Sequence, residues 1–146
     1  MKDTLVKVAE YANEDKEKQY EKMRKIIGGI LIGFGCFLTV SALMIFPSDS
    51  SWGSIYSMIG AIILSIGFYQ LIFKNKYKIV FSIGCFLIVL GSLIFVDFLG
   101  VKIGNQVPRF AYEKDWSDDT IIYKAPFYTV IRHNYDTENE YLEVTY

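Results

Sequence analysis

The chain has 146 residues, of which 52% are hydrophobic and 21% charged, and its formal net charge is -1. This near-neutral charge excludes a general electrostatic attraction to nucleic acid. The apolar residues are concentrated in three long runs, so few residues remain for an ordinary soluble domain.

The first 25 residues combine a high charge density with a near balance of sign, because they hold seven basic and six acidic residues. Glu14 and Lys18, like Glu21 and Lys25, are four residues apart, a spacing that favours ion pairs on one face of a helix. The segment 1–25 is therefore predicted to form a charged, cytoplasmic juxtamembrane helix.

Three runs of 21 residues, at 26–46, 53–73 and 79–99, contain almost no charge. At a rise of 1.5 Å per residue, each helix would span roughly 30 Å, the thickness of the hydrocarbon core of a bilayer. Their one charged residue is Asp97, near the end of the third run. Because Asp97 lies within one turn of the end of the run, we interpret it as a residue of the membrane interface that pairs with Lys102. The alternative is a functional proton or ion site.

The charges of the loops predict the orientation, because Lys and Arg are retained on the cytoplasmic side. Seven basic residues precede the first run, Lys74, Lys76 and Lys78 lie between the second and third, and 47–52 has none. Lys102 and Arg109, which follow the third run, count mildly against this pattern. We expect a multi-pass protein of the cell membrane with a cytoplasmic N-terminus and an extracytoplasmic C-terminus.

Small residues indicate where the spans pack, since lipid supplies no hydrophobic drive and helices must approach closely. The expected helix-packing residues are Gly29, Gly33, Gly60, Gly67, Gly84 and Gly91. A compact bundle over 26–99 within one chain accounts for them, and a homo-oligomer seam at Gly29 and Gly33 is the alternative. Cys36 and Cys85 lie within the spans and are interpreted as small packing residues.

The tail, 100–146, has the alternating pattern of a small antiparallel β domain. Strands are expected at 107–112, 120–124, 127–133 and 140–146. A turn is expected at 116–119, and the Asn and Asp residues of 134–139 are typical of a hairpin loop. The fold class is thus membrane α-helical: three transmembrane helices, an N-terminal juxtamembrane helix and a small C-terminal antiparallel β extracytoplasmic domain.

The residues of the tail offer little for catalysis. His133 is the one histidine, and the tail has no cysteine, so nucleophilic catalysis and an ordinary zinc site are not expected. No catalytic, cofactor-binding or metal-ligating residue is therefore assigned, and no cofactor is expected. Calcium binding by loop carboxylates is kept as an alternative to solvated acidic loops, at Asp115, Asp118 and Asp119 or at Asp136, Glu138 and Glu140.

The tail is rich in tyrosine, a residue favoured at binding surfaces. The expected partner-binding residues are Tyr128, Arg132, Tyr141, Glu143 and Tyr146. We expect a small non-enzymatic integral membrane protein that recognises a protein or peptide partner at the cell surface. The most concrete form of this hypothesis is a bacterial immunity protein or a protein that neutralises a toxin.

Two other classes remain open. One is an accessory or regulatory subunit of a larger membrane transport or secretion complex, held there by the spans and the charged amino-terminal arm. The other is an oligomeric channel or transporter whose flux would depend on Asp97. In every case the expected partners are the lipid bilayer and protein or peptide, and not nucleic acid.

Overall fold

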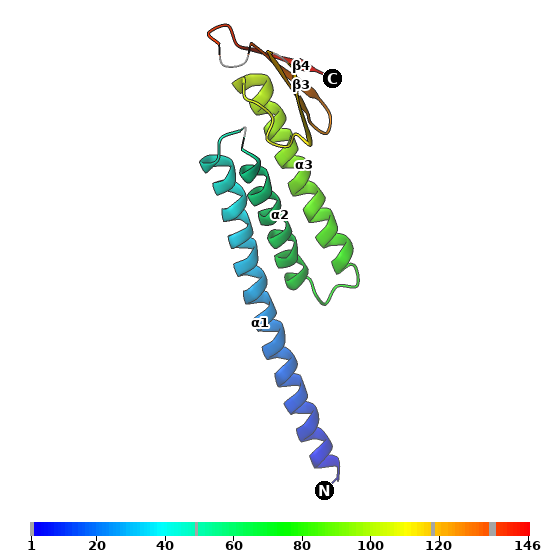
Figure 1. Ribbon diagram of the computed structural model, residues 1–146. Coiled ribbons are helices and arrows are strands. Elements are labelled where there is room, and N and C mark those ends of the chain that lie inside the picture. The colour runs from blue at the N-terminus through cyan, green and yellow to red at the C-terminus, as the bar shows by residue number, and fades with distance from the viewer. Residues whose placement is uncertain (1, 49, 118, 135–136) are drawn as a thin grey trace.

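The computed structural model describes residues 2–48, 50–117, 119–134 and 137–146, which form three helices and one four-stranded sheet. The helices are α1 (Lys2–Ile45), α2 (Ser51–Leu71) and α3 (Lys78–Gly104). The strands are β1 (Glu113–Ser117), β2 (Thr120–Lys124), β3 (Thr129–His133) and β4 (Tyr141–Thr145). The sheet lies beside the C-terminal end of α3, and α2 lies between α1 and α3 (Figure 1).

All three helices contain stretches long and apolar enough to cross a membrane. The third helix continues five residues beyond the predicted end of its run, to Gly104. Its 27 residues correspond to about 40 Å, against about 30 Å for a hydrocarbon core. This helix is therefore longer than a hydrocarbon core is thick, and its last turns carry the sheet.

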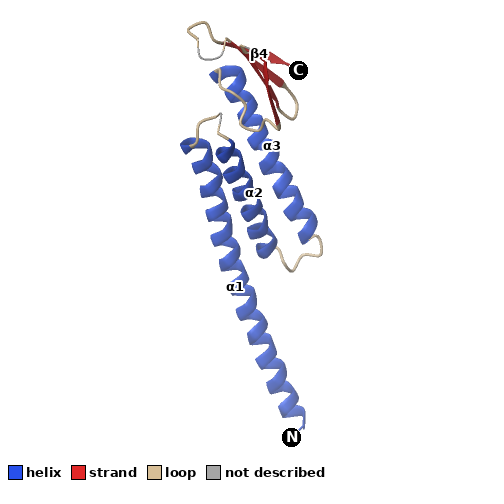
Figure 2. Cartoon of the chain, viewed as in Figure 1, coloured by secondary structure: helices blue, strands red, loops and turns tan. Residues whose placement is uncertain are grey.

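The predicted juxtamembrane helix and the first span form one unbroken helix of 44 residues (Figure 2). Both predicted ion pairs on its surface are confirmed. Lys18 Nζ lies 3.3 Å from Glu14, and Lys25 Nζ lies 3.1 Å from Glu21. The arm is thus a direct extension of the first span.

The first two helices pack through small residues. Residues of α2 that are buried against α1 recur at alternating spacings of four and three. This spacing is typical of two helices that cross with a left-handed supercoil. The residues are Gly53, Ser57, Gly60, Leu64 and Gly67. On α1 the facing residues are Gly28 and Gly35. A Cβ added to Gly28 would lie 2.9 Å from the Gly67 carbonyl oxygen, and one on Gly35 would lie 2.8 Å from that of Gly60. Only glycine permits this approach.

The other predicted packing glycines have open space around them. A Cβ added to Gly29, Gly33, Gly84 or Gly91 would meet no atom within 4 Å. Within the chain, α1 therefore uses Gly28 and Gly35 in place of the predicted pair Gly29 and Gly33. The predicted pair faces away from α2, because neighbouring residues on a helix point about 100° apart.

The helices form a row rather than the compact bundle expected from the sequence. The C-terminal half of α1 packs along α2, whereas α3 contacts α2 over a smaller surface (Figure 1). One hydrogen bond of 2.7 Å joins the last two helices, from the Ser82 hydroxyl to the Ser65 carbonyl. Most of the apolar surface of α3 is therefore open to lipid or to another chain.

The sheet is an antiparallel meander with the order β1-β2-β3-β4. In its inner face, Val130 of β3 lies opposite Tyr123 of β2 and Val144 of β4. This face packs on Phe98 and Val101 of α3 and forms the core of the tail. Apolar contacts thus attach the sheet to α3, in addition to the polar contacts described below.

Three of the four predicted strands are confirmed at or within the expected residues. The fourth is wrong, because the first strand is β1 and not 107–112. Trp116 and Ser117 of the predicted turn belong to β1, and Asp118 lies outside the described residues. The segment 107–112 instead crosses the ends of the helices, where its polar groups bind α1, α2 and α3. In the predicted hairpin loop, residues 135 and 136 also lie outside the described residues.

Candidate functional site

The candidate site is the junction between the sheet and the helices, and its centre is Asp97. This side chain is only 6% exposed. Its carboxylate accepts hydrogen bonds from the backbone N–H of Arg109 at 2.8 Å, from that of Phe110 at 3.3 Å and from the Tyr128 hydroxyl at 2.9 Å. A buried carboxylate is costly unless donors surround it, and these three satisfy the requirement.

The end of α3 turns the chain back toward Asp97. Asn105 has a φ of 50° and a ψ of 39°, in the left-handed region, and the N–H of Gln106 donates to the Gly100 carbonyl at 3.3 Å. A left-handed residue with such a bond terminates a helix, and asparagine tolerates the conformation better than most residues. The residues that follow then pass beside Asp97 and present two backbone amides to it.

The predicted pairing of Asp97 with Lys102 is wrong. No ion pair joins them in the described part of the chain, and the Lys102 Nζ lies 5.7 Å and 5.9 Å from the ring centroids of Phe98 and Tyr146. Five helical residues correspond to a rotation of about 140°, so the two side chains leave α3 in different directions.

Arg109 joins all three helices to the segment before the sheet. Its guanidinium donates to two carbonyls at the end of α1, from Nη1 to Phe46 at 2.8 Å and from Nη2 to Leu43 at 3.1 Å. Its own carbonyl accepts the Ser54 hydroxyl of α2, and its N–H binds Asp97 of α3. A cation at a helix C-terminus satisfies open carbonyls and the negative end of the helix dipole.

Sequence reasoning missed this role, and treated Arg109 only as a charge counting against the orientation. The residues that Arg109 binds on α1 are 63 and 66 positions away in the sequence. No local pattern signals a contact at that separation.

Tyr128 connects the sheet to Asp97 and was assigned to the wrong role. It was expected at a partner surface, but it is 4% exposed and its ring packs edge-on against Phe98 at 5.4 Å. Burial, followed by the negative charge of Asp97, raises the pKa of the Tyr128 hydroxyl above its ordinary value. The hydroxyl therefore stays protonated and acts as a donor.

The other four expected partner residues do not form one surface. Arg132 points to the inner face, where its guanidinium binds Glu140 through two hydrogen bonds of 2.6 and 2.9 Å. Tyr146 is exposed, and its ring lies 6.1 Å from that of Phe98.

The remaining two lie on the outer face with His133. Tyr141 stacks on the His133 ring at 4.6 Å, and a Glu143 carboxylate oxygen lies 3.1 Å from His133 Nε2. Both Tyr141 and Glu143 stay exposed at the free edge of the sheet. They are the two predicted partner residues that share one exposed face.

The two edges of the sheet differ in charge. The edge strand β1 carries Glu113, Lys114 and Asp115, and the first and last of these lie 2.9 and 3.5 Å from Lys124 Nζ. The hydrogen bond that the Lys124 ammonium donates to the Glu113 carboxylate is the main cause that raises the pKa of Lys124. The opposite edge strand, β4, has Glu143 as its one charged residue.

Within the described residues, no group of three His, Cys, Asp or Glu side chains is arranged to hold a metal ion. Asp118 and Asp136, one from each of the two acidic loops considered for calcium, lie outside the described residues. The carboxylate at the junction, Asp97, is occupied by hydrogen-bond donors of the chain itself.

Comparisons of the chain with models of protein families, with curated proteins and with solved structures give no match. The described part of the chain has two features that bear on function: a sheet fixed to the helices at Asp97 and Arg109, and one sheet edge that carries little charge.

Proposed function

We propose that this chain is a non-enzymatic recognition protein of the membrane, which binds a protein or peptide partner through the free edge of β4. The observation that carries the proposal is the position of β4 at the end of the sheet order, with one charged residue among its five. An open strand edge offers unpaired backbone groups to which an extended partner segment can add as a further strand.

The contrast with β1 supports the choice of edge. Charged residues on an edge strand discourage pairing with other chains, and β1 has three of them in a row. On β4, the exposed Tyr141 and Glu143 supply an aromatic anchor and a charge beside the open backbone. Specificity would come from these side chains, and affinity from the backbone hydrogen bonds.

The rigid attachment of the sheet also supports recognition. Two hydrogen bonds to Asp97 and the guanidinium of Arg109 fix the segment that leads into the sheet, and a third hydrogen bond to Asp97, from Tyr128, fixes the sheet itself. A surface that is already ordered loses less conformational entropy when it binds a partner.

The proposed side for this recognition is the extracytoplasmic one. The basic residues of α1 and of the loop 72–77 lie at the end of the helices opposite the sheet (Figure 1). Retention of Lys and Arg in the cytoplasm would then leave the sheet outside. In the most concrete form of the proposal, the partner is a secreted toxin or peptide that the protein neutralises at the membrane surface of a bacterium.

The proposal is tested by photo-crosslinking in native membranes. A photoreactive amino acid replaces Tyr141 or Thr145 on β4, and in the matched controls it replaces Ser117 or Glu113 on β1, which lie on the same face of the sheet. All four positions are exposed. We expect a discrete protein or peptide adduct from the β4 positions and none from the β1 positions. Adducts from β1 alone, or none from β4, would exclude recognition through this edge.

A second candidate, an accessory subunit of a larger membrane complex, is favoured by the open surface of α3. Ile88 in the middle of this helix is 72% exposed and borders a groove of about 690 Å³ beside α2. The same photoreactive group at Ile88, with Ile30 of α1 as the control, distinguishes the two candidates. Protein adducts from Ile88 and none from β4 would favour the subunit.

A further inference from the structure

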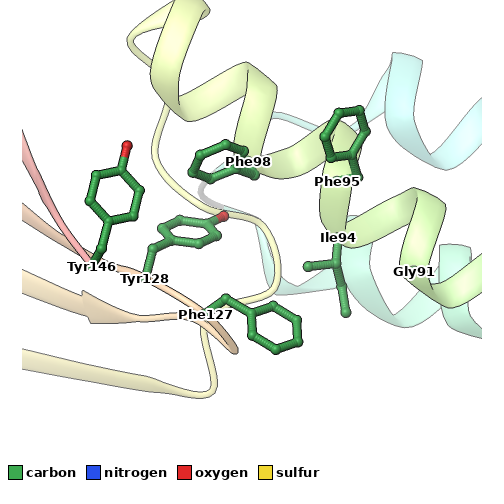
Figure 3. A pocket seen from close by; sticks show the side chains of 7 residues that line it. All are labelled: Gly91, Ile94, Phe95, Phe98, Phe127, Tyr128 and Tyr146. Atoms are coloured by element: carbon green, nitrogen blue, oxygen red, sulfur yellow. The ribbon is translucent and has the colours of Figure 1, made fainter.

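An apolar pocket of about 370 Å³ lies where the sheet overhangs α3. Figure 3 shows Phe127 and Tyr128 on one side, facing Ile94, Phe95 and Phe98 of α3 on the other. The volume lies within the range of small-molecule sites, about 300–1,000 Å³. The lining is almost wholly hydrocarbon and includes Gly91 of α3, around which an added Cβ would meet nothing within 4 Å.

The pocket lies at the depth where the acyl chains of a lipid begin. Gly91 to Phe98 belong to the last turns of the apolar run of α3, and Lys102 follows one turn later. The rise from Gly91 to Lys102 is about 16 Å along the helix. An apolar groove with a cation above it has the dimensions and polarity of a lipid placed head-outward beside the helix.

Lys102 supplies the charge above the pocket. It is the one basic residue in the last turn of α3, and its side chain is exposed. Its ammonium lies over the rings of Phe98 and Tyr146, both of which line the pocket, and no carboxylate pairs with it among the described residues. A basic residue near the membrane surface attracts anionic headgroups, by about fivefold in binding per residue.

We propose that this pocket binds an anionic phospholipid, with one acyl chain between Phe127 and the Gly91 face of α3 and the headgroup phosphate on Lys102. The inference requires only that the helices lie in a bilayer. It does not depend on the side that the sheet faces or on a partner at β4, so either proposal can fail without the other.

The test uses the full chain in phosphatidylcholine vesicles that contain a phospholipid probe with a photoreactive acyl chain. The probe is phosphatidylglycerol in one series and phosphatidylcholine in the other, and adducts are located by peptide mass spectrometry. We expect adducts on Phe95, Phe98 or Phe127, and about five times more of them from the anionic probe.

Two pairs of variants define the site. Lys102→Gln should remove the fivefold preference for the anionic probe, whereas Lys114→Gln should not, although Lys114 also lies over an aromatic ring at 4.6 Å. Gly91→Leu should fill the pocket and remove adducts from both probes at these residues. Gly84→Leu, one heptad earlier with equally open surroundings, should leave them unchanged.

Three results would overturn the proposal. The first is an even spread of adducts along the exposed face of α3. The second is the same probe preference in both lysine variants, and the third is the persistence of the adducts in Gly91→Leu. A crosslink between two copies through Phe127 would assign the pocket to self-association instead. Because Lys102 is exposed, its variant tests headgroup binding even if Gly91→Leu fails to fold.

Discussion

The Tyr128 hydroxyl donates a buried hydrogen bond of 2.9 Å to the Asp97 carboxylate, across 31 residues of sequence. The other two donors to this carboxylate are backbone amides, which a side-chain substitution does not remove. Tyr128 is therefore the position at which the attachment of the sheet to α3 can be weakened most selectively.

Replacing Tyr128 by Phe keeps the ring against Phe98 and removes the hydroxyl. We expect the free energy of unfolding of the tail to fall by about 1–3 kcal/mol, because a buried carboxylate loses one of its three donors. Hydrogen exchange of the amides in β2 and β3 measures this loss. Tyr112→Phe is the control, since Tyr112 is 72% exposed, and equal protection in both variants would contradict the expectation.

The same bond makes the tail sensitive to alkali. Burial and Asp97 raise the pKa of Tyr128 in the folded chain above its unfolded value of about 10. A raised pKa favours the protonated hydroxyl, so this contribution to stability is complete below pH of about 10 and is lost as the pH rises further. Unfolding followed from about pH 8 to 12 should show this loss. This loss of stability should be weaker in Tyr128→Phe. The same pH profile in the variant and in the original chain would contradict a role of the Tyr128 hydroxyl in stability.

Arg109 should not be replaceable by lysine. Its planar guanidinium reaches two carbonyls at the end of α1, whereas an ammonium is a single point of charge. For Arg109→Lys we expect a loss of about 1–3 kcal/mol and faster hydrogen exchange at residues 42–46. Arg132→Lys, which alters the pair with Glu140 within the sheet domain, is the control and should leave exchange at the end of α1 unchanged.

The glycines of α1 should respond differently to alanine. A Cβ on Gly35 would lie 2.7 Å from the Leu64 backbone nitrogen, so Gly35→Ala should separate α1 from α2 and lower the melting temperature in detergent. Gly29 has open surroundings, and Gly29→Ala should be neutral or raise the melting temperature, because alanine favours a helix by up to about 1 kcal/mol. Similar effects at both positions would contradict this packing.

The orientation of the chain in the membrane can be measured by labelling engineered cysteines in intact cells with a membrane-impermeant maleimide. Cys36 and Cys85 are first replaced by Ala, and either Lys16→Cys or Thr145→Cys is then introduced at an exposed position. Because basic residues are retained inside, we expect labelling at 145 in intact cells and at 16 only after lysis. The opposite result would exclude recognition outside the cell.

Features with a short sequence period were predictable. The ion pairs of α1 and the strand at 120–124 follow from patterns that repeat every two to four residues, and the three apolar runs follow from 21-residue stretches with almost no charge. The boundaries were less predictable where tertiary contacts extend an element. The helix α3 continues to Gly104 because Val101 is buried under the sheet.

The junction could not have been predicted in the same way. The sequence singles out Asp97 as the one charge in the apolar runs, but it does not identify the groups that bind its carboxylate. Two of these are backbone amides, and the third is a tyrosine that was expected on the surface. Glycines were recognised as packing residues, but the face that they use on α1 depends on the rotation of the helix. The order of residue types in the sequence predicts neither which backbone amides act as donors nor how a helix is rotated about its axis.

The unbroken course of α1 has a mechanical consequence. Residues 2–25 correspond to about 36 Å of helix beyond the first predicted span. Proline, a common cause of kinks, is absent from α1. The helix therefore acts as a stiff lever whose fulcrum is the packing on Gly60 and Gly67. A tilt of about 10° there displaces the amino terminus by about 7–9 Å, because about 39–50 Å of helix separate it from Gly28 and Gly35, so small rotations at this contact become larger movements at the far tip.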